Sequence, residues 1–212
     1  MTGKLIIITS PSGGGKGTLI REILQRVPNI GYSVSLTTRT QRPGEVDGRD
    51  YRFVTKAEFE EFRVNGGFLE YAEVHGNCYG TSIAMTRELI DAGKDVILEI
   101  DVQGAADVHA KVPDAVSIFI LPPSFEALAE RLRRRATEKP EELALRLRNS
   151  FDEVNRYSEF EYAVINDNVP DAVKRLESII LGDRQRRTRQ TGPINDILIS
   201  FDASKRAFGQ DQ

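Results

Sequence analysis

The sequence has little of several features that define particular protein classes. Its 212 residues include a single cysteine, Cys78, so no internal disulfide can form. Two histidines, His75 and His109, together with that one cysteine are too few for the usual ligand set of a structural zinc site. No apolar run approaches the roughly 20 residues that a membrane-spanning helix needs. We therefore expect a soluble protein without disulfides, structural zinc or a membrane span.

The charge balance and the N-terminal sequence give further information on the class of protein and its partners. Lys and Arg total 29 and Asp and Glu total 32, which gives a formal net charge of −3. General nucleic-acid-binding proteins are usually basic, so the composition disfavours that class. The N-terminus M-T-G-K-L-I-I-I-T leads directly into an apolar run and has no signal-peptide architecture. We expect a cytoplasmic protein that acts without nucleic acid or membrane partners.

Short apolar runs alternate with helical patterns along most of the chain. The runs typical of strands buried on both faces are residues 4–9, 96–100, 117–121 and 163–166. Helical patterns cover residues 15–27, 82–92, 103–111, 125–135, 141–157 and 171–184. This alternation predicts an α/β fold with a parallel, doubly wound sheet covered on both faces.

Residues 34–81 depart from this alternation. The strand patterns in and beside this segment are residues 33–39, 51–54 and 69–75, and the Asp47-Gly48 pair indicates a turn. Thr55 and Glu58 have the spacing of a capping box, so a short helix is expected before Gly66-Gly67. The segment is predicted to form a small β-rich insertion in the α/β core.

Two further segments interrupt or follow the core. Around residues 134–145, R-R-A-T-E-K-P-E-E separates two helical patterns and predicts a second insertion. The basic stretch R-Q-R-R-T-R after residue 183 is interpreted as a solvated helix end, with a contact in a homo-oligomer as the alternative. The later stretch I-N-D-I-L-I-S-F is apolar enough to dock as a helix or strand. The predicted organisation is a core of residues 1–33 and 82–184, an insertion at 34–81 and a tail at 185–212.

The stretch S-P-S-G-G-G-K-G-T, residues 10–18, lies between a predicted strand and a predicted helix. Backbone N–H groups at such a helix N-terminus can point at phosphate oxygens, and glycines permit the close approach. Lys16 would supply a mobile charge at the β- and γ-phosphates. The alternative is a glycine-rich turn with an exposed lysine. The expected nucleotide contacts are Ser12, Gly13, Gly14, Gly15, Lys16, Gly17 and Thr18.

This loop departs from the usual pattern G-x-x-x-x-G-K-[ST] at two positions. Ser10 stands in place of the first glycine, and Gly17 stands in place of the hydroxyl residue that often contacts Mg²⁺. Thr18 would then bond a phosphate oxygen, and Mg²⁺ would be held mainly by phosphates and waters, which suits an ion that dehydrates reluctantly. Glu99 is either a group that reaches the metal through water or a plain acid at a strand end.

The insertion at residues 34–81 and the end of the predicted strand at residues 96–100 carry groups suited to a second, phosphate-bearing substrate. Arg39 and Arg42, near a turn, can hold a phosphate through bidentate contacts. Glu70 and Asp101 are carboxylates, which accept hydrogen bonds and donate none when ionised. Guanine offers N1–H and the N2 amino group as donors, and adenine lacks that pair. These residues therefore suit GMP better than AMP.

Together these stretches resemble the guanylate kinases, which are nucleoside-monophosphate kinases of the P-loop class. The resemblance extends from about residue 4 to about residue 184. It rests on S-P-S-G-G-G-K-G-T, S-V-S-L-T-T-R-T-Q-R-P-G-E, F-L-E-Y-A-E-V-H-G-N-C-Y-G-T, I-D-V-Q-G-A, I-F-I-L-P-P-S and V-I-N-D-N, in this order. It implies transfer of the γ-phosphoryl of Mg-ATP to GMP or dGMP, a parallel-sheet core, a GMP-binding insertion and a helical lid at about residues 126–150.

The resemblance also implies roles for individual residues. The GMP phosphate would be held by Ser35, Arg39, Arg42, Tyr51 and Tyr79. Guanine would be recognised by Glu70, Thr81 and Asp101. Catalytic charge would come from Lys16, Arg131, Arg135 and Arg146, and Asn166 would lie near the adenine of ATP. The chain departs from the family at Gly17, usually Ser or Thr, at Cys78, usually Tyr, at Glu99, commonly Asp, and at R-R-A in place of a G-R-G-like stretch.

Three other functions share parts of these motifs. A ribose bisphosphate kinase would share the loop without needing the base-recognising Glu70 and Asp101. A phosphopeptide-binding scaffold domain of guanylate-kinase type would lack the ATP loop, which is present here. A GTPase-like switch would need a Mg²⁺-binding hydroxyl in the residue after the lysine, and this chain has Gly17 there.

Overall fold

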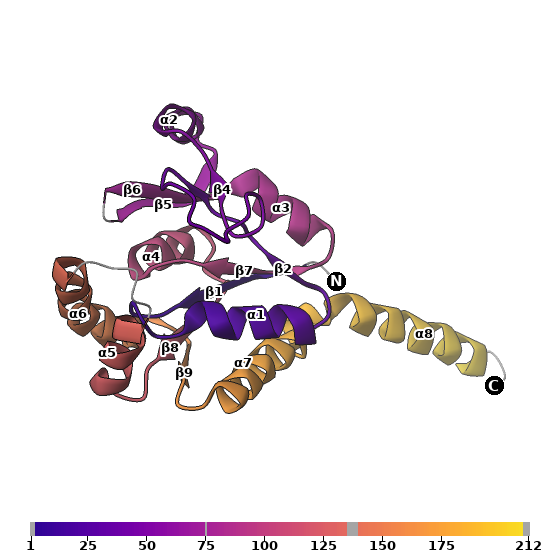
Figure 1. Cartoon of the computed structure of the whole chain (residues 1–212). Helices are drawn as coiled ribbons and strands as arrows, with labels where there is room; N and C mark the ends of the chain where they lie inside the picture. Colours follow the sequence, from indigo (N-terminus) through magenta and orange to yellow (C-terminus); the bar gives the residue numbers. More distant parts are fainter. Residues whose placement is uncertain (1–2, 75, 135–139, 210–212) are drawn as a thin grey trace.

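The computed structural model describes residues 3–74, 76–134 and 140–209. Its centre is a five-stranded sheet in the order β2-β7-β1-β8-β9 (Figure 1). The strands are β2 (Ile30–Tyr32), β7 (Asp95–Glu99), β1 (Leu5–Thr9), β8 (Val116–Leu121) and β9 (Tyr162–Ile165). All neighbouring pairs in this sheet are parallel, which confirms the predicted α/β core.

The two faces of the sheet are covered by different helices because the residues of β1 alternate between them. Ile6 and Ile8 pack with α1 (Lys16–Arg26) and α7 (Val169–Arg184) in one hydrophobic cluster. Leu5 and Ile7 belong to a second cluster on the opposite face, with α3 (Ile83–Asp91) and α4 (Val102–Lys111). The central strand is buried along its whole length, so its carboxyl end is held rigidly between the two layers.

The predicted β-rich insertion forms a separate four-stranded sheet in the order β4-β3-β6-β5. Its elements are β3 (Leu36–Thr37), β4 (Arg52–Phe53), α2 (Lys56–Val64), β5 (Phe68–Val74) and β6 (Asn77–Ser82). The capping box at the start of α2 is present as predicted: Thr55 Oγ1 accepts from the Glu58 N–H, and the Glu58 carboxylate accepts from the Thr55 N–H. The sequence did not predict β6, which pairs with β5 as an antiparallel hairpin.

The segment between β8 and β9 contains two helices, α5 (Phe125–Arg134) and α6 (Pro140–Asn155), followed by a short 3₁₀ turn, η1 (Arg156–Glu159). Phe125 and Phe151 stack with their ring centroids 4.9 Å apart and so join the two helices. Part of the predicted second insertion lies outside the described residues, and so does Arg135. The described residues of the expected lid lie in α5 and α6, and their role as a lid stays a prediction.

The end of the chain forms a short 3₁₀ turn, η2 (Arg187–Arg189), and the helix α8 (Thr191–Gly209). Figure 1 shows α8 extending away from the core beyond the end of α7. The expectation that this apolar stretch docks on the protein is wrong for the described chain. Ile197, Leu198 and Phe201 are 55%, 56% and 71% exposed. Among the described helices, none is long and apolar enough to cross a membrane.

The sequence predicted that the basic stretch before α8 is a solvated helix end, and this holds for only part of it: Arg186 and Arg187 are exposed, but Arg184 and Arg189 are largely buried. Asp95, at the start of β7, accepts hydrogen bonds from Arg184 Nε at 2.7 Å, Arg189 Nη2 at 2.6 Å and the Lys4 backbone N–H at 2.9 Å. Arg189 also donates to Asp183 at 2.7 Å, and its side chain is 8% exposed. This buried ion cluster fastens the end of α7 to the amino end of the sheet.

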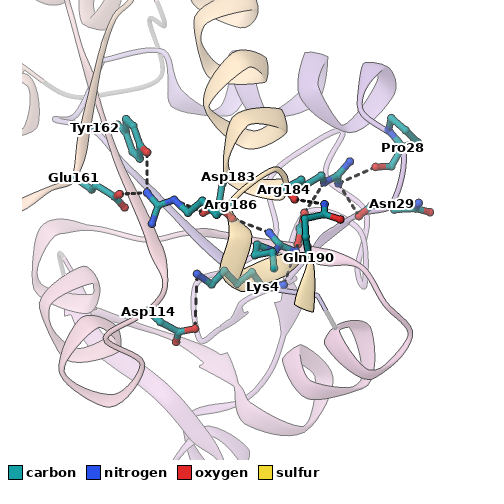
Figure 2. Close-up of polar contacts among 12 residues, drawn as sticks. Lys4, Pro28, Asn29, Asp114, Glu161, Tyr162, Asp183, Arg184, Arg186 and Gln190 are labelled. Carbon is teal, nitrogen blue, oxygen red and sulfur yellow. Dashed lines mark hydrogen bonds and ion pairs between the residues drawn. The ribbon is translucent and has the colours of Figure 1, made fainter. Parts of the chain in front are cut away.

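Figure 2 shows the surroundings of this cluster. The Arg184 guanidinium also donates to the carbonyls of Pro28 and Asn29 at 2.9 and 3.2 Å. Arg186 pairs with Glu161 and donates to the Tyr162 hydroxyl at 2.9 Å. Two arginines of this charge run are therefore links within the protein: Arg184 joins α7 to the turn before β2, and the more exposed Arg186 reaches the start of β9.

Candidate active site

The loop after β1 has the conformation that a phosphate-binding loop requires. Gly13 and Gly15 have φ angles of 85° and 91°, in the left-handed region that side chains disfavour. A Cβ at Gly15 would lie 2.3 Å from Asn166 Nδ2, so both space and backbone exclude a side chain there. Helix α1 begins at Lys16, and the first N–H groups of the helix therefore face the loop.

The cationic groups beside this loop are bonded to neutral carbonyls. Lys16 Nζ donates to the Ile100 carbonyl at 2.9 Å. Arg131, on α5, donates through Nη2 to the Asn166 carbonyl at 2.8 Å and through Nη1 to the Gly14 carbonyl at 3.4 Å. Because these acceptors carry no formal charge, both side chains keep a net positive charge at the loop. Cations held in this way favour binding of a polyphosphate.

Asn166 lies against the phosphate loop. Its side chain is 2% exposed, and its Nδ2 group donates to the Gly14 carbonyl at 2.8 Å. The Oδ1 atom is buried and has no hydrogen-bond partner among the described residues. The observed contact therefore supports the loop, and the predicted position near adenine stays a prediction.

The sequence did not indicate Glu153 as part of the site. Its Oε2 atom accepts a hydrogen bond from the Ser12 backbone N–H at 2.9 Å, which links α6 to the phosphate loop. Ser12 and Glu153 are 141 residues apart in the chain, so no local pattern could have paired them. Arg146, on the same helix, is half-buried and takes part in an interaction of its own.

Glu99 ends β7 directly beside the loop. A Cβ built on Gly17 would lie 3.5 Å from Glu99 Oε1 and 3.9 Å from Oε2. The Tyr32 hydroxyl donates to Oε2 at 3.1 Å. Burial and the adjacent Glu99 carboxylate raise the pKa of Tyr32, which keeps that hydroxyl protonated. The described residues contain no group of three or more His, Cys, Asp or Glu side chains placed to hold a metal ion alone.

The residues predicted to recognise guanine come together between β5, β6 and α4. The Thr81 hydroxyl donates to Glu70 Oε1 at 2.5 Å, and Glu70 is 5% exposed. Asp101 caps α4 by accepting from the Gln103 and Gly104 N–H groups at 3.1 and 2.8 Å. A Cβ at Gly104 would lie 2.6 Å from Glu70 Oε2 and 3.4 Å from Asp101 Oδ1. Gly104 therefore makes room for the two carboxylates to lie side by side.

Glu70 is held in an unusual electrostatic environment. Burial raises its pKa strongly, the Thr81 hydrogen bond lowers it, and the nearby charge of Asp101 raises it again. The net result is a pKa of about 7, against an ordinary value of 4.5. The carboxylate is therefore poised to gain an ionic or hydrogen-bonded partner that compensates its burial.

The predicted acceptor-phosphate residues also come together, although not all of them make direct contact. The Arg39 guanidinium lies 5.3 Å from the centre of the Tyr51 ring, and the Tyr51 and Tyr79 rings are 5.9 Å apart. Glu45 accepts from Arg39 Nη2 at 2.8 and 3.0 Å and from the Arg42 backbone N–H at 2.8 Å. Burial and the charge of Glu99 raise the pKa of Tyr51 to about 12, so its hydroxyl remains a donor.

Two of the predicted acceptor-phosphate residues, Arg42 and Ser35, are connected to the others less directly. The Arg42 side chain is exposed, and it is the Arg42 backbone N–H that bonds Glu45. Ser35 is buried just before β3, and its carbonyl accepts from the Arg52 N–H at 2.9 Å. No side-chain contact from Ser35 to Arg39, Tyr51 or Tyr79 occurs among the described hydrogen bonds. Their shared role in binding phosphate stays a prediction.

The doubly wound parallel sheet, the glycine loop at the carboxyl end of its central strand and the lysine at the start of α1 define a P-loop kinase. The family model "Guanylate kinase" matches residues 2–182. The guanylate kinase of Clostridium perfringens (strain SM101 / Type A) is 50% identical over 187 residues, covering 88% of this chain and 87% of that protein. The guanylate kinase of Lactococcus lactis subsp. lactis (strain IL1403) is also 50% identical over 187 residues, covering 88% of this chain and 91% of that protein.

A solved structure agrees with these sequence matches. The crystal structure of guanylate kinase from Anaplasma phagocytophilum superimposes with a TM-score of 0.76 at 34% identity, covering 94% of this chain and 95% of that chain. The chain belongs to the guanylate kinase family.

Proposed function

We propose that this protein transfers the γ-phosphoryl group of ATP to GMP, giving ADP and GDP, with dGMP as a second acceptor. The observation that carries the proposal is the convergence of two sites at the end of β7. Lys16 donates to the carbonyl of Ile100, and the next residue, Asp101, lies beside Glu70. A nucleotide on the loop and a guanine between the carboxylates would thus bring their phosphates toward each other.

Recognition of the acceptor base depends on ionised carboxylates. One oxygen of Glu70 accepts from Thr81, and the other faces Gly104 and Asp101. Ionised Glu70 can accept from the N1–H and the N2 amino group of guanine, and adenine does not offer this pair of donors. A pKa of about 7 makes this acceptor sensitive to pH in the neutral range.

Phosphoryl transfer between two nucleotides is mainly a problem of position and charge. The acceptor is a phosphate oxygen that is already ionised near neutral pH, so no strong general base is needed. Lys16 and Arg131 would neutralise charge on the transferring group, and Arg39, with the Tyr51 and Tyr79 hydroxyls, would align the acceptor phosphate. Movement of α5 and α6 toward the site would exclude water, which otherwise hydrolyses ATP.

The residues at the loop fit the Mg²⁺ ion that accompanies ATP. The carboxylate of Glu99 lies close to Gly17 at the N-terminus of α1, and Mg²⁺ in kinase sites takes one or two carboxylates together with phosphate and water oxygens. When bound, the ion neutralises negative charge on the β- and γ-phosphates. The substrates are small molecules of the cytoplasm, which we propose as the location of the reaction.

The decisive experiment measures ADP production from Mg-ATP by the purified protein, with GMP, dGMP, AMP, UMP, CMP and ribose 1,5-bisphosphate offered separately. We expect strong turnover with GMP, weaker turnover with dGMP and negligible turnover with the others. Preferred turnover of AMP would contradict the assignment of Glu70 and Asp101. Folded protein that binds GMP but phosphorylates none of these acceptors would instead be a binding module.

A further inference from the structure

Glu99 and Gly17 lie opposite each other because of the register of the central sheet. In the parallel pairing of β1 with β7, Glu99 is the partner of Ile8, the residue just before the last of β1. The phosphate loop leaves β1 directly after this point, and Gly17 is the second residue of α1. The carboxylate at the end of β7 is therefore directed at the start of the nucleotide-binding helix.

Gly17 leaves open the space that a side chain at this position would occupy. A Cβ there would be in ordinary van der Waals contact with Glu99, 3.5 Å from Oε1. In P-loop enzymes the residue after the lysine usually supplies a hydroxyl to Mg²⁺, and an acid on a neighbouring strand supplies a carboxylate. Here the hydroxyl is missing, and the acid is Glu, which reaches about 1.5 Å farther than Asp, one C–C bond.

The orientation of this carboxylate is determined by one partner. Tyr32, on β2, donates its hydroxyl to Oε2 at 3.1 Å. Among the described hydrogen bonds, none reaches Oε1, which is the oxygen nearer to Gly17. Tyr32 therefore holds one oxygen in place and leaves the other directed at the nucleotide-binding helix.

We propose that Glu99 Oε1 takes the place of the missing hydroxyl at position 17 as a protein ligand of the Mg²⁺ that accompanies the nucleotide. Gly17 and Glu99 then act as a pair, because a hydroxyl-bearing side chain at position 17 would occupy Glu99 Oε1 in place of the metal. Tyr32 is the positioning residue of this pair. The inference rests on the proposed function, since it is that function which brings a Mg-nucleotide to the loop.

The pair predicts that two substitutions compensate each other. Gly17→Ser alone places a hydroxyl against Glu99, which captures it in a charge-assisted hydrogen bond and blocks the ligand position. Glu99→Asp alone leaves the carboxylate too short to reach. The double variant restores a hydroxyl and a short acid. Gly17 lies in a helix and has no left-handed φ angle, so serine is compatible with the backbone.

The test uses calorimetric titration of ADP into the wild type, the two single variants and the double variant, with excess Mg²⁺ and with EDTA. The quantity compared is the ratio of ADP affinity with metal to that without metal. We expect each single variant to lower this ratio by about tenfold, as losses near a metal typically do, and the double variant to recover most of it. Because each protein is compared with itself, any effect of a substitution on metal-free ADP binding cancels in this ratio.

Two further variants make the test specific. Gly182→Ser, on α7, makes the same chemical change where no atom lies within 4 Å of the added Cβ, and it should leave the ratio unchanged. Tyr32→Phe should lower the metal-linked ratio while the affinity in EDTA stays constant, an outcome that a merely structural role would not produce.

Single variants that keep the wild-type ratio, or losses that simply multiply in the double variant, would overturn the inference. The readout requires no turnover, so it separates this inference from the proposed function. A protein that shows the compensation but does not phosphorylate GMP would disprove only the proposed function. A protein that phosphorylates GMP without the compensation would disprove only the pairing.

Discussion

The two ends of the central sheet use basic side chains in opposite ways. At the carboxyl end, Lys16 and Arg131 donate to backbone carbonyls. At the amino end, Arg184 and Arg189 donate to Asp95, whose side chain is 3% exposed. One strand, β7, carries the acid of each end, since it begins with Asp95 and ends with Glu99.

This contrast separates a binding role from a structural one. Carbonyl partners orient a cation without cancelling its charge, so Lys16 and Arg131 keep their positive charge for a bound phosphate. Carboxylate partners cancel the charge, and only such pairing allows an arginine to be as buried as Arg189. For these four residues, the partner of the basic side chain therefore indicates its role better than its position in the sequence does.

The largest effect on the carboxyl end should come from Lys16→Met. We expect kcat to fall by about 10²–10³-fold, because the variant has no charge to direct at the transferring phosphoryl group. The free energy of unfolding should change by less than about 1 kcal/mol, since the substitution removes a single hydrogen bond to the Ile100 carbonyl. The measurements are steady-state kinetics and urea unfolding.

The control for this variant is Lys174→Met, which removes an exposed lysine paired with Asp171 at 3.5 Å. It should change neither kcat nor stability. A Lys16→Met enzyme with wild-type turnover would show that the carbonyl-bonded cation has no catalytic role.

The matching change at the amino end is Arg189→Ala. It leaves Asp95 and Asp183 buried without this partner, and breaking such a pair costs about 3–5 kcal/mol of unfolding free energy. The kcat of the folded enzyme should stay at the wild-type value. Chemical unfolding and activity measured on the same sample separate the two quantities.

Arg26→Ala is the control, because its pair with Glu22 is about 40% exposed on both sides. We expect it to change stability by less than about 0.5 kcal/mol. An Arg189 variant as stable as this control, or one that loses turnover without losing stability, would contradict the structural assignment.

The two ends should also respond to pH with opposite signs. The raised pKa of Glu70 means that the folded protein holds this proton more tightly than the unfolded chain, so its contribution to stability falls as pH rises from 4.5 to about 7. Burial alone would raise the pKa of Asp95, but hydrogen bonds from Arg189 and Arg184 lower it. Its stabilisation is therefore present above the ordinary value of 3.8 and is lost as pH falls further.

The titration of Glu70 should also control GMP binding, because only the ionised carboxylate can accept hydrogen bonds from the guanine edge. We expect the KM for GMP to rise by up to about tenfold per pH unit below pH 7, while the KM for ATP changes little. Glu70→Gln should weaken GMP binding and flatten this dependence. A Glu70→Gln profile as steep as the wild type would assign the titration to another group.

The smallest effect should come from Glu153, which bonds the phosphate loop to α6. Glu153→Ala leaves the Ser12 N–H without this acceptor, and we expect the KM for ATP to rise by about fivefold, the cost of roughly one hydrogen bond. Glu153→Gln keeps an acceptor oxygen and should stay within about twofold of the wild type. Equal effects of the two substitutions would show that charge, rather than the hydrogen bond, matters at this position.

Much of the fold follows from local patterns. The apolar runs predict β1, β7, β8 and β9, and the Thr55–Glu58 capping box predicts the start of α2. The sequence does not predict β2 or β6. The β6 stretch N-C-Y-G-T-S has no alternation of apolar residues, and it is extended because β5 pairs with it.

The positions of several candidate residues follow from motifs that carry their own geometry. The glycine loop joins β1 to α1, Lys16 begins α1 and Asp101 caps α4, whereas Glu70 lies within β5. The partners of these groups were not predictable, because the contact between Glu153 and Ser12 joins residues far apart in the chain. The same holds for the fit of Glu99 against Gly17, which depends on the register between β1 and β7.

The sequence by itself determined the layered α/β core, the phosphate loop and the family, because periodicity, glycine spacing and motif order are local properties of the chain. Only the tertiary structure decided which arginines are structural and that α8 leaves its apolar residues exposed. The link between Asp95 and Arg189 spans 94 residues, and a charge run contains no information about such a partner. Ion pairing, burial and the space opposite a glycine arise only when distant segments meet.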